Sequence, residues 1–110
     1  MKNLQKRCND QAHAKGWGDP DFCEQFALIH SEISEALESW RNNEPLSWTD
    51  DKGKPQGIAS EYADAVIRIM HYCEFLGIDL QTEIVRKLDY NLTRPFRHGK
   101  DNGPEVTVKS

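Results

Sequence analysis

The sequence lacks a long apolar run and has few cysteines, and both absences exclude classes of protein. No stretch approaches the roughly 18 consecutive apolar residues of a membrane-spanning helix. The amino terminus, Met1 to Gln11, has no apolar stretch of the signal-peptide type. The three cysteines (Cys8, Cys23 and Cys73) form no C-x-x-C pair, a pattern typical of reduced core thiols and not of zinc sites. We therefore expect a cytoplasmic protein without a membrane segment.

An excess of basic residues is also absent. The 110 residues include 14 Lys and Arg against 18 Asp and Glu, which gives a formal net charge of −4. General nucleic-acid binders normally carry a basic domain, so this balance argues against a nucleic-acid partner. The length predicts a single domain with a modest core, to which self-association could add buried surface.

Apolar residues recur at helical spacing in the first half of the chain. Residues 2–15 carry apolar side chains at four-residue steps, which predicts a weakly amphipathic helix. Asp19 and Pro20 form a typical helix start, an N-cap acceptor followed by proline. This second helix is expected to end at Asn42 and to bury a regularly spaced stripe, which consists of Phe22, Phe26, Ile29, Ile33, Leu37 and Trp40.

The second half of the chain predicts two further helices after a long connection. Residues 42–57 are rich in Pro, Gly and Asp and are expected to form a loop without regular structure. A third helix is expected over Ile58–Leu76, with Gly77 as its C-terminal break. A fourth should run from a cap at Asp79 to about Thr93, with an inner face made of Leu80, Ile84, Leu88 and Leu92.

The chain therefore divides into a helical domain and a tail. No segment alternates clearly enough to be a central strand, so the expected class is all-α. Residues 1–95 form the predicted domain, and residues 96–110 form a polar, basic C-terminal tail that could close over a site.

Two pairs of acidic residues have the spacing of a carboxylate site. Glu32 and Glu35 lie three residues apart on the second predicted helix, and Glu61 and Asp64 do so on the third. Residues at this spacing share one helical face, and both pairs flank the apolar stripes. Four carboxylates converging between packed helices would repel one another unless a cation neutralised them. Oxygen-only ligands suit Mg²⁺, with Mn²⁺ as the second choice.

Plainer interpretations of the same residues stay open. Asp64 could simply pair with Arg68 one turn later on a solvated face. A di-iron bundle would need Glu-x-x-His pairs, which His30 and His71 are not placed to supply. Three further glutamates are interpreted as ordinary solvated charges on outer faces, namely Glu24, Glu38 and Glu74.

An ordered set of motifs, from about residue 10 to residue 100, resembles one known family. The set comprises the segment His13-Ala14-Lys15-Gly16-Trp17, the acidic helix over 28–38, the E-x-x-D pair, and Lys87, Asn91 and the RPFRHGK run over 94–100. This pattern is similar to that of the MazG-like all-α nucleotide pyrophosphohydrolases. One departure is Ser31, where the family often has a second glutamate. The resemblance implies a four-to-five-helix MazG-like bundle completed by homo-oligomerisation.

The resemblance also implies an activity and roles for the acids. The activity is hydrolysis of a nucleoside triphosphate between its α- and β-phosphates, in nucleotide-pool control or house-cleaning. Glu32, Glu35, Glu61 and Asp64 would hold Mg²⁺, and Glu35, assisted by Glu32, would orient or deprotonate the attacking water.

Substrate contacts are expected from three parts of the chain. Lys87, with a catalytic role as well, would contact the phosphates together with Asn91, Arg94, Arg97 and Lys100. The base-binding candidates are Trp17, Lys15, Trp48 and His13, whereas Trp40 is expected in the core.

The remaining expectations concern the substrate, the oligomeric state and the alternative functions. The substrate is a nucleoside triphosphate, and the assembly is a homodimer or a homotetramer. Two other interpretations remain: a catalytically inactive helical module that binds nucleotide or protein, and a purely structural helical dimer.

Overall fold

The computed structural model describes residues 1–95, and these residues are mainly helical, as the sequence predicts. Within this part of the chain, no helix is long and apolar enough to cross a membrane. The elements in chain order are α1 (Lys2–Ala14), α2 (Phe22–Arg41), β1 (Trp48–Thr49), β2 (Pro55–Gln56), α3 (Ile58–Leu76) and α4 (Leu80–Leu92).

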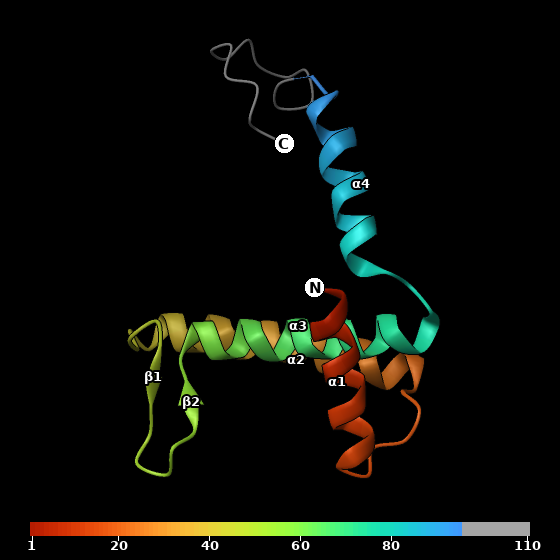
Figure 1. Ribbon diagram of the computed structural model, residues 1–110. Helices are drawn as coiled ribbons and strands as arrows, with labels where there is room; N and C mark the ends of the chain where they lie inside the picture. The colour runs from red at the N-terminus through yellow and green to blue at the C-terminus, as the bar shows by residue number, and fades with distance from the viewer. Residues whose placement is uncertain (96–110) are drawn as a thin grey trace.

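The body of the molecule is an antiparallel helix pair crossed by a third helix (Figure 1). α2 and α3 lie side by side along their length, and α1 packs across α3. The β1–β2 hairpin extends from one end of the pair, on the side where α1 ends. α4 projects on the opposite side, and its main packing is against α1.

The predicted helix ends hold with one correction. Asp21, not Asp19, caps α2, because its Oδ2 accepts a hydrogen bond from the Glu24 backbone N–H at 2.9 Å. Pro20 therefore precedes the cap and does not open the helix. Asp79 caps α4 through the Thr82 N–H at 3.3 Å, and Gly77, at φ +75°, ends α3 as expected.

The connection over 42–57 contains an element that the sequence analysis missed. β1 and β2 form a short antiparallel hairpin in which Trp48 pairs with Gln56. Asp50 organises its turn, since its carboxylate accepts hydrogen bonds from the Lys52 and Lys54 backbone N–H groups, each at 2.9 Å. Hydrogen bonds from the backbone to the Asp50 side chain therefore hold this turn. The spacing of apolar residues does not predict such a turn.

The prediction that the apolar stripe of the second helix is buried is wrong for the single chain. The face of α2 that packs on α3 carries small and polar residues, with Gln25, Glu32, Ala36 and Ser39 buried. Trp40, predicted in the core, is 61% exposed. The other exposed members of that stripe are Phe22, Phe26, Ile33 and Leu37.

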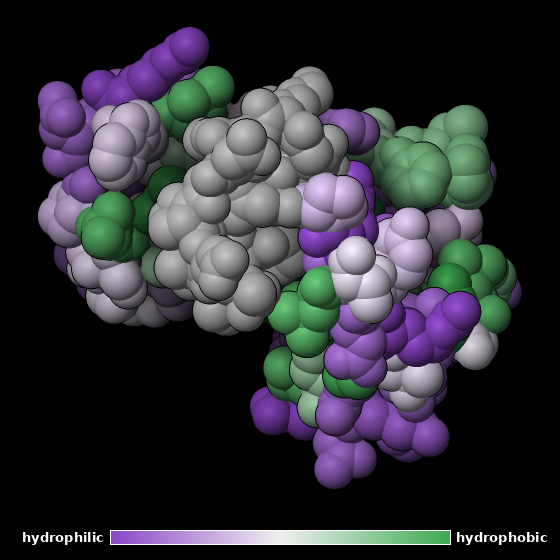
Figure 2. All heavy atoms as spheres, turned by 90° about the horizontal axis from the view of Figure 1, so that it is seen from above, coloured by the Kyte–Doolittle hydropathy of each residue, from purple (hydrophilic) through white to green (hydrophobic). Residues whose placement is uncertain are grey.

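The fourth helix departs from prediction in the same way. No residue of α4 is buried, so its expected inner face is not covered in the single chain. Ile84 and Leu88 are 38% and 53% exposed. Apolar side chains therefore reach the surface on several elements, as the view from above shows (Figure 2). The buried apolar residues are Cys8, Ala36, Ala65, Met70 and Cys73.

A buried glutamine joins α1 to the junction between α3 and α4. The Gln5 side chain, 2% exposed, donates to the Glu74 carboxylate at 3.1 Å and to the Ile78 carbonyl. Its oxygen accepts from the Leu80 N–H at 3.1 Å. Glu74 is therefore half-buried and bonded, not an outward solvated charge.

The cysteine expectation holds for two of three residues. Cys8 and Cys73 are buried, and the Cys8 thiol lies 3.9 Å from the Met70 sulfur. Cys23 is exposed on α2, so its expected core position is wrong.

We predict that Gly57→Ala destabilises the fold more than Gly53→Ala. Both glycines have positive φ, at +96° and +82°, so each alanine costs roughly 1 kcal/mol of backbone strain. A Cβ at Gly57 would also lie 2.7 Å from the Pro45 and Leu46 carbonyl oxygens, whereas Gly53 has open space around it. Urea unfolding should show the larger loss for Gly57→Ala, and equal midpoints for both variants would contradict the contact.

Candidate functional site

Packing of α2 against α3 brings three of the four predicted carboxylates together. One oxygen from each of Glu32, Glu61 and Asp64 lies within 4.8 Å of the others. Glu32 is buried in the middle of α2, Glu61 is half-buried in the first turn of α3, and Asp64 is exposed one turn later. We call these three residues the carboxylate cluster.

Glu35, the fourth predicted ligand, lies beside the cluster and not within it. Its side chain is exposed, and it is absent from the group of three that shares the short distances. Its negative charge nevertheless helps to raise the pKa of Glu61. Glu35 is therefore near enough to act on the site electrostatically, on the outer side of α2.

Neighbouring negative charges and burial raise the pKa values of the cluster carboxylates. Burial raises the pKa of Glu61 to about 7, helped by a hydrogen bond between the Glu61 and Glu32 carboxyls and by the neighbouring negative charges. The pKa of Asp64 is also raised, first by burial and then by Glu32, while Arg68 and Lys54 act in the opposite direction. The cluster thus carries more negative charge than its surroundings neutralise.

Arg68 is a site residue to which the sequence analysis gave no functional role. The sequence suggests Arg68 only as a partner for Asp64, whereas in the structure its Nε donates to Glu32 Oε1 across the α2/α3 interface at 3.2 Å. The Arg68 backbone carbonyl accepts a 2.8 Å hydrogen bond from the buried Gln25 amide. The sequence does show a basic residue one turn after Asp64. It does not show how α3 is aligned along α2, and this alignment decides which acid Arg68 contacts.

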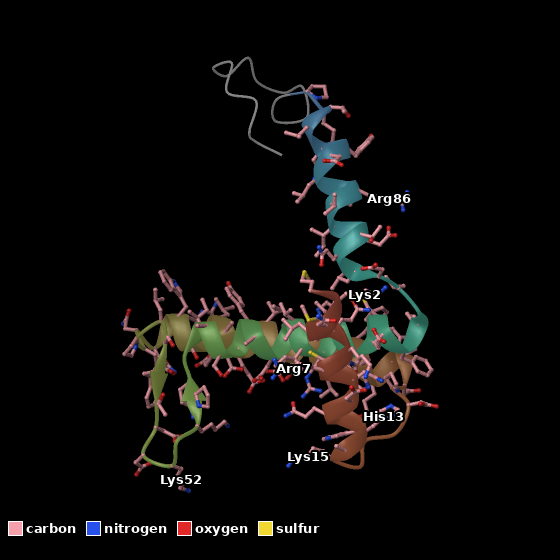
Figure 3. All side chains as sticks on the ribbon, in the orientation of Figure 1. Lys2, Arg7, His13, Lys15, Lys52 and Arg86 are labelled. Carbon is pink, nitrogen blue, oxygen red and sulfur yellow. The ribbon has the colours of Figure 1, made fainter. Side chains whose placement is uncertain are left out.

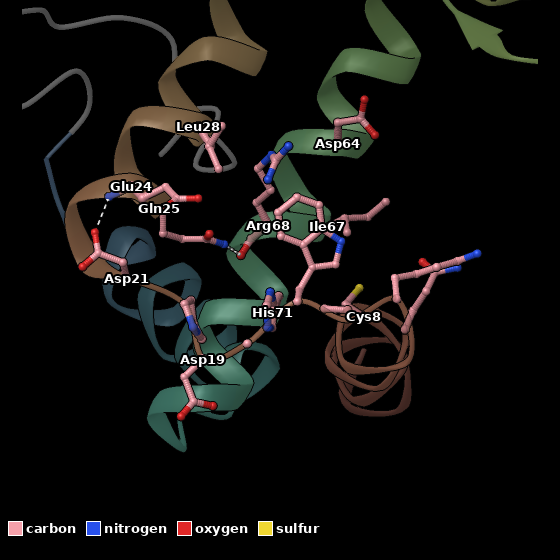
Figure 4. Close-up of a pocket in the computed structure, with 16 residues that line it drawn as sticks. Cys8, Asp19, Asp21, Glu24, Gln25, Leu28, Asp64, Ile67, Arg68 and His71 are labelled. Carbon is pink, nitrogen blue, oxygen red and sulfur yellow. Dashed lines mark hydrogen bonds between the residues drawn. The ribbon is translucent and has the colours of Figure 1, made fainter.

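A cavity of about 660 Å³ opens beside the cluster, between α1, α2 and α3 (Figure 4). Asp64 and Arg68 line it from α3, and Lys15 and Trp17 line it from the end of α1. Trp17 is 61% exposed, so its ring is available to a ligand. Two predicted base-binding residues therefore share one cavity with a predicted metal ligand.

The other two predicted base-binding residues lie outside the cavity lining. The His13 ring meets the His71 ring edge-on at 6.3 Å, and it is His71 that lines the cavity. Burial lowers the pKa of His71, so its imidazole is neutral near pH 7, and its Nε2 has no hydrogen-bond partner within residues 1–95. Trp48 lies on the hairpin and donates to the Glu44 carboxylate at 3.1 Å.

Within the described chain, the predicted phosphate-binding residues of α4 are not brought to the cluster. Lys87 and Asn91 are on α4, which projects from the far side of the α2/α3 pair, as Arg86 on α4 and Lys15 on α1 show in Figure 3. Lys87 Nζ instead lies 5.5 Å from the centre of the Tyr90 ring. Arg94 follows α4 directly, and the predicted contacts at Arg97 and Lys100 lie outside the described residues.

The donor chemistry of the cluster fits a hard divalent cation. All three candidate ligands are carboxylates, and no sulfur or imidazole joins them within the described part of the chain. Such oxygen donors favour Mg²⁺ or Mn²⁺ over zinc. The raised pKa of Glu61 fits the same interpretation, because positive charge placed among the carboxylates would stabilise their ionised forms.

Comparisons with known proteins identify no relative of this chain. Protein-family models, curated proteins and solved structures were all searched, and none of them matches the chain.

We predict that Glu61→Gln stabilises the metal-free protein at pH 8. The folded chain keeps the Glu61 proton up to about pH 7, whereas the ordinary pKa is 4.5. Between these values the folded state binds more protons, so the free energy of unfolding falls as pH rises. At pH 8 the ionised Glu61 is repelled by its acidic neighbours, and Glu61→Gln removes this repulsion. Because solvent screens the repulsion, we expect a gain of about 1 kcal/mol in the free energy of unfolding, which raises the Tm measured in EDTA by roughly 4 °C in a small domain.

The stabilisation should shrink toward pH 4.5, where Glu61 is protonated in the folded wild type. Glu38→Gln is the matched control, an exposed acid on α2 outside the carboxylate cluster. Equal Tm shifts for the two variants at pH 8 would show that Glu61 is not under special strain.

Proposed function

We propose that this chain is a Mg²⁺-dependent nucleoside triphosphate pyrophosphohydrolase. The observation that carries the proposal is the carboxylate cluster, with its oxygens within 4.8 Å of one another, at the edge of a cavity lined by Trp17, Lys15 and Arg68. A cation site, positive side chains and an aromatic ring in one place suit a ligand with polyphosphate and base. The MazG-like motif order in the sequence supports the same activity.

In this proposal the cluster residues, Glu32, Glu61 and Asp64, would hold Mg²⁺. Bound there, Mg²⁺ supplies charge neutralisation for the phosphates and a lower pKa for coordinated water. Glu32 is fixed by its 3.2 Å hydrogen bond from Arg68, so this ligand has a defined orientation before any ion binds. Asp64 is exposed and can adjust its rotamer.

Glu35 is the proposed general base, with Glu32 assisting. The Glu35 carboxylate is exposed beside the cluster and near enough to Glu61 to raise its pKa. It can therefore accept a proton from a water molecule bound next to the cluster. The water oxygen forms a bond to the α-phosphorus, and the bond between that phosphorus and the bridging oxygen to the β-phosphate breaks. The products are a nucleoside monophosphate and pyrophosphate, so atoms balance without a further reactant.

The cavity would bind the nucleoside. The Trp17 ring offers a stacking surface for a base, and Lys15 lines the same cavity. His71 also lines the cavity with a neutral ring, whose buried Nε2 has no hydrogen-bond partner within residues 1–95. His13 and Trp48 are left without a role in this arrangement.

We predict Mg²⁺-dependent release of pyrophosphate from at least one nucleotide in a panel of canonical and modified (d)NTPs. Asp64→Asn and Glu35→Gln should each lower kcat/KM by about 100-fold or more, because the first removes a proposed Mg²⁺ ligand and the second removes the proposed general base. Glu38→Gln, an exposed acid on the same helix as Glu35, is the control and should retain activity.

Two results would overturn the activity. Release of single phosphates would assign a different cleavage position. Nucleotide binding with no turnover of any panel member would favour the inactive binding module instead.

We propose further that the chain works as a homodimer or homotetramer. The buried apolar set of the single chain is small, and the apolar side chains of α4 and of the α2 stripe are exposed. Exposed apolar faces of this extent mark interaction surfaces. A second copy of the chain offers matching faces, and it could bring Lys87 and Asn91 to the carboxylate cluster of its partner.

Light scattering should give a mass of two or four times the 12.7 kDa chain. The double variant Ile84→Gln, Leu88→Gln should lower the mass or abolish cooperative unfolding, since it removes apolar area from an exposed α4 face. Arg86→Gln, on the same helix, should leave the mass unchanged. A wild-type monomer that unfolds cooperatively would contradict self-association.

A further inference from the structure

Arg68 occupies the boundary between the carboxylate cluster and the cavity. Its Nε donates to Glu32 Oε1 at 3.2 Å, and its side chain is 31% exposed, against 10% for Glu32. One end of the guanidinium is thus tied to the buried carboxylate, while the side chain also lines the cavity. In Figure 4 the guanidinium lies between Leu28 of α2 and Asp64 of α3.

Two contacts fix the position of Arg68 before any ligand arrives. Gln25, only 6% exposed, donates its amide to the Arg68 backbone carbonyl at 2.8 Å. The contact to Glu32 then orients the guanidinium plane. An arginine held at its backbone and at Nε loses little side-chain freedom when its remaining donors find an acceptor.

The remaining donors of Arg68 are unused within the described chain. A guanidinium carries five N–H donors, and within residues 1–95 the Arg68 guanidinium makes one hydrogen bond, from Nε to Glu32. Its two terminal nitrogens make no hydrogen bond to any residue from 1 to 95. These paired donors match two oxygens of a phosphate group, a geometry that lysine lacks.

We propose that Arg68 is the phosphate-binding cation of this subunit, contacting the substrate polyphosphate in the cavity that Lys15 also lines. The inference rests on the proposed function, because it takes a nucleoside polyphosphate as ligand. Within one chain, Arg68 takes the phosphate-binding role that the sequence suggests for Lys87, which lies on the projecting α4. Four carboxylates also line the cavity, namely Asp19, Asp21, Glu24 and Asp64, and their negative charge favours binding of the polyphosphate as its Mg²⁺ complex.

The test measures binding of inorganic tripolyphosphate with excess Mg²⁺ by calorimetry on the full chain. Arg68→Gln should weaken this binding by about 10- to 100-fold, since it removes charge-assisted hydrogen bonds. Arg68→Lys should give an intermediate loss, because it keeps the charge but not the paired donors. Arg86→Gln is the matched control, an arginine ion-paired at 2.9 Å to Glu83 on α4, and should bind as the wild type does.

Mg²⁺ binding alone separates phosphate contact from structural damage. Removing a positive charge beside carboxylates should leave Mg²⁺ affinity of Arg68→Gln equal to or tighter than that of the wild type. Parallel loss of Mg²⁺ and tripolyphosphate affinity would reduce Arg68 to a support for Glu32 and overturn the inference. Unchanged tripolyphosphate affinity, or none in the wild type, would overturn it as well.

Nucleotide turnover distinguishes this failure from failure of the proposed function. Pyrophosphate release with a KM that Arg68→Gln leaves unchanged would overturn the role of Arg68 and leave the activity standing. Arg68-dependent tripolyphosphate binding without turnover of any nucleotide would support the phosphate site and overturn the activity.

Discussion

Mutual repulsion of carboxylates at the α2/α3 interface is the constraint on which the rest of the structure depends. Helix packing holds Glu32, Glu61 and Asp64 with oxygens within 4.8 Å, and the pKa of Glu61 rises to about 7 through burial and its acidic neighbours. One internal cation, Arg68, offsets part of this charge through its contact with Glu32. Holding like charges this close costs folding stability, a conflict that is commonly found at functional sites.

The same interface explains why the helices were predictable and their packing was not. Apolar periodicity and capping residues located all four helices, with α2 starting at a different cap. The inner face of α2, however, carries Gln25, Glu32, Ala36 and Ser39, and hydrogen bonds such as that from Gln25 to the Arg68 carbonyl join it to α3. Periodicity identifies an apolar face but not its partner, so exposed Trp40 was assigned to a core that the single chain does not form.

The site was predictable to the extent that it depends on spacing along one helix. The i, i+3 acids could be placed on faces from sequence, and three of the four converge. The contact of Arg68 to Glu32 crosses from one helix to another, so spacing along α3 alone gives this residue no functional role. The expected role of Lys87 depends on where α4 lies, and α4 projects away from the α2/α3 pair. Contacts between elements far apart in sequence depend on helix register, which one sequence does not specify.

The central claim is that the carboxylate cluster binds a divalent cation beside a nucleotide-binding cavity. Crystals grown with Mn²⁺ and a non-hydrolysable triphosphate analogue, with anomalous diffraction at the manganese edge, test it most directly. The account predicts an anomalous peak bound by oxygens of Glu32, Glu61 and Asp64, with the analogue reaching from it into the cavity lined by Trp17. Manganese bound only elsewhere, or an analogue outside that cavity, would contradict the account.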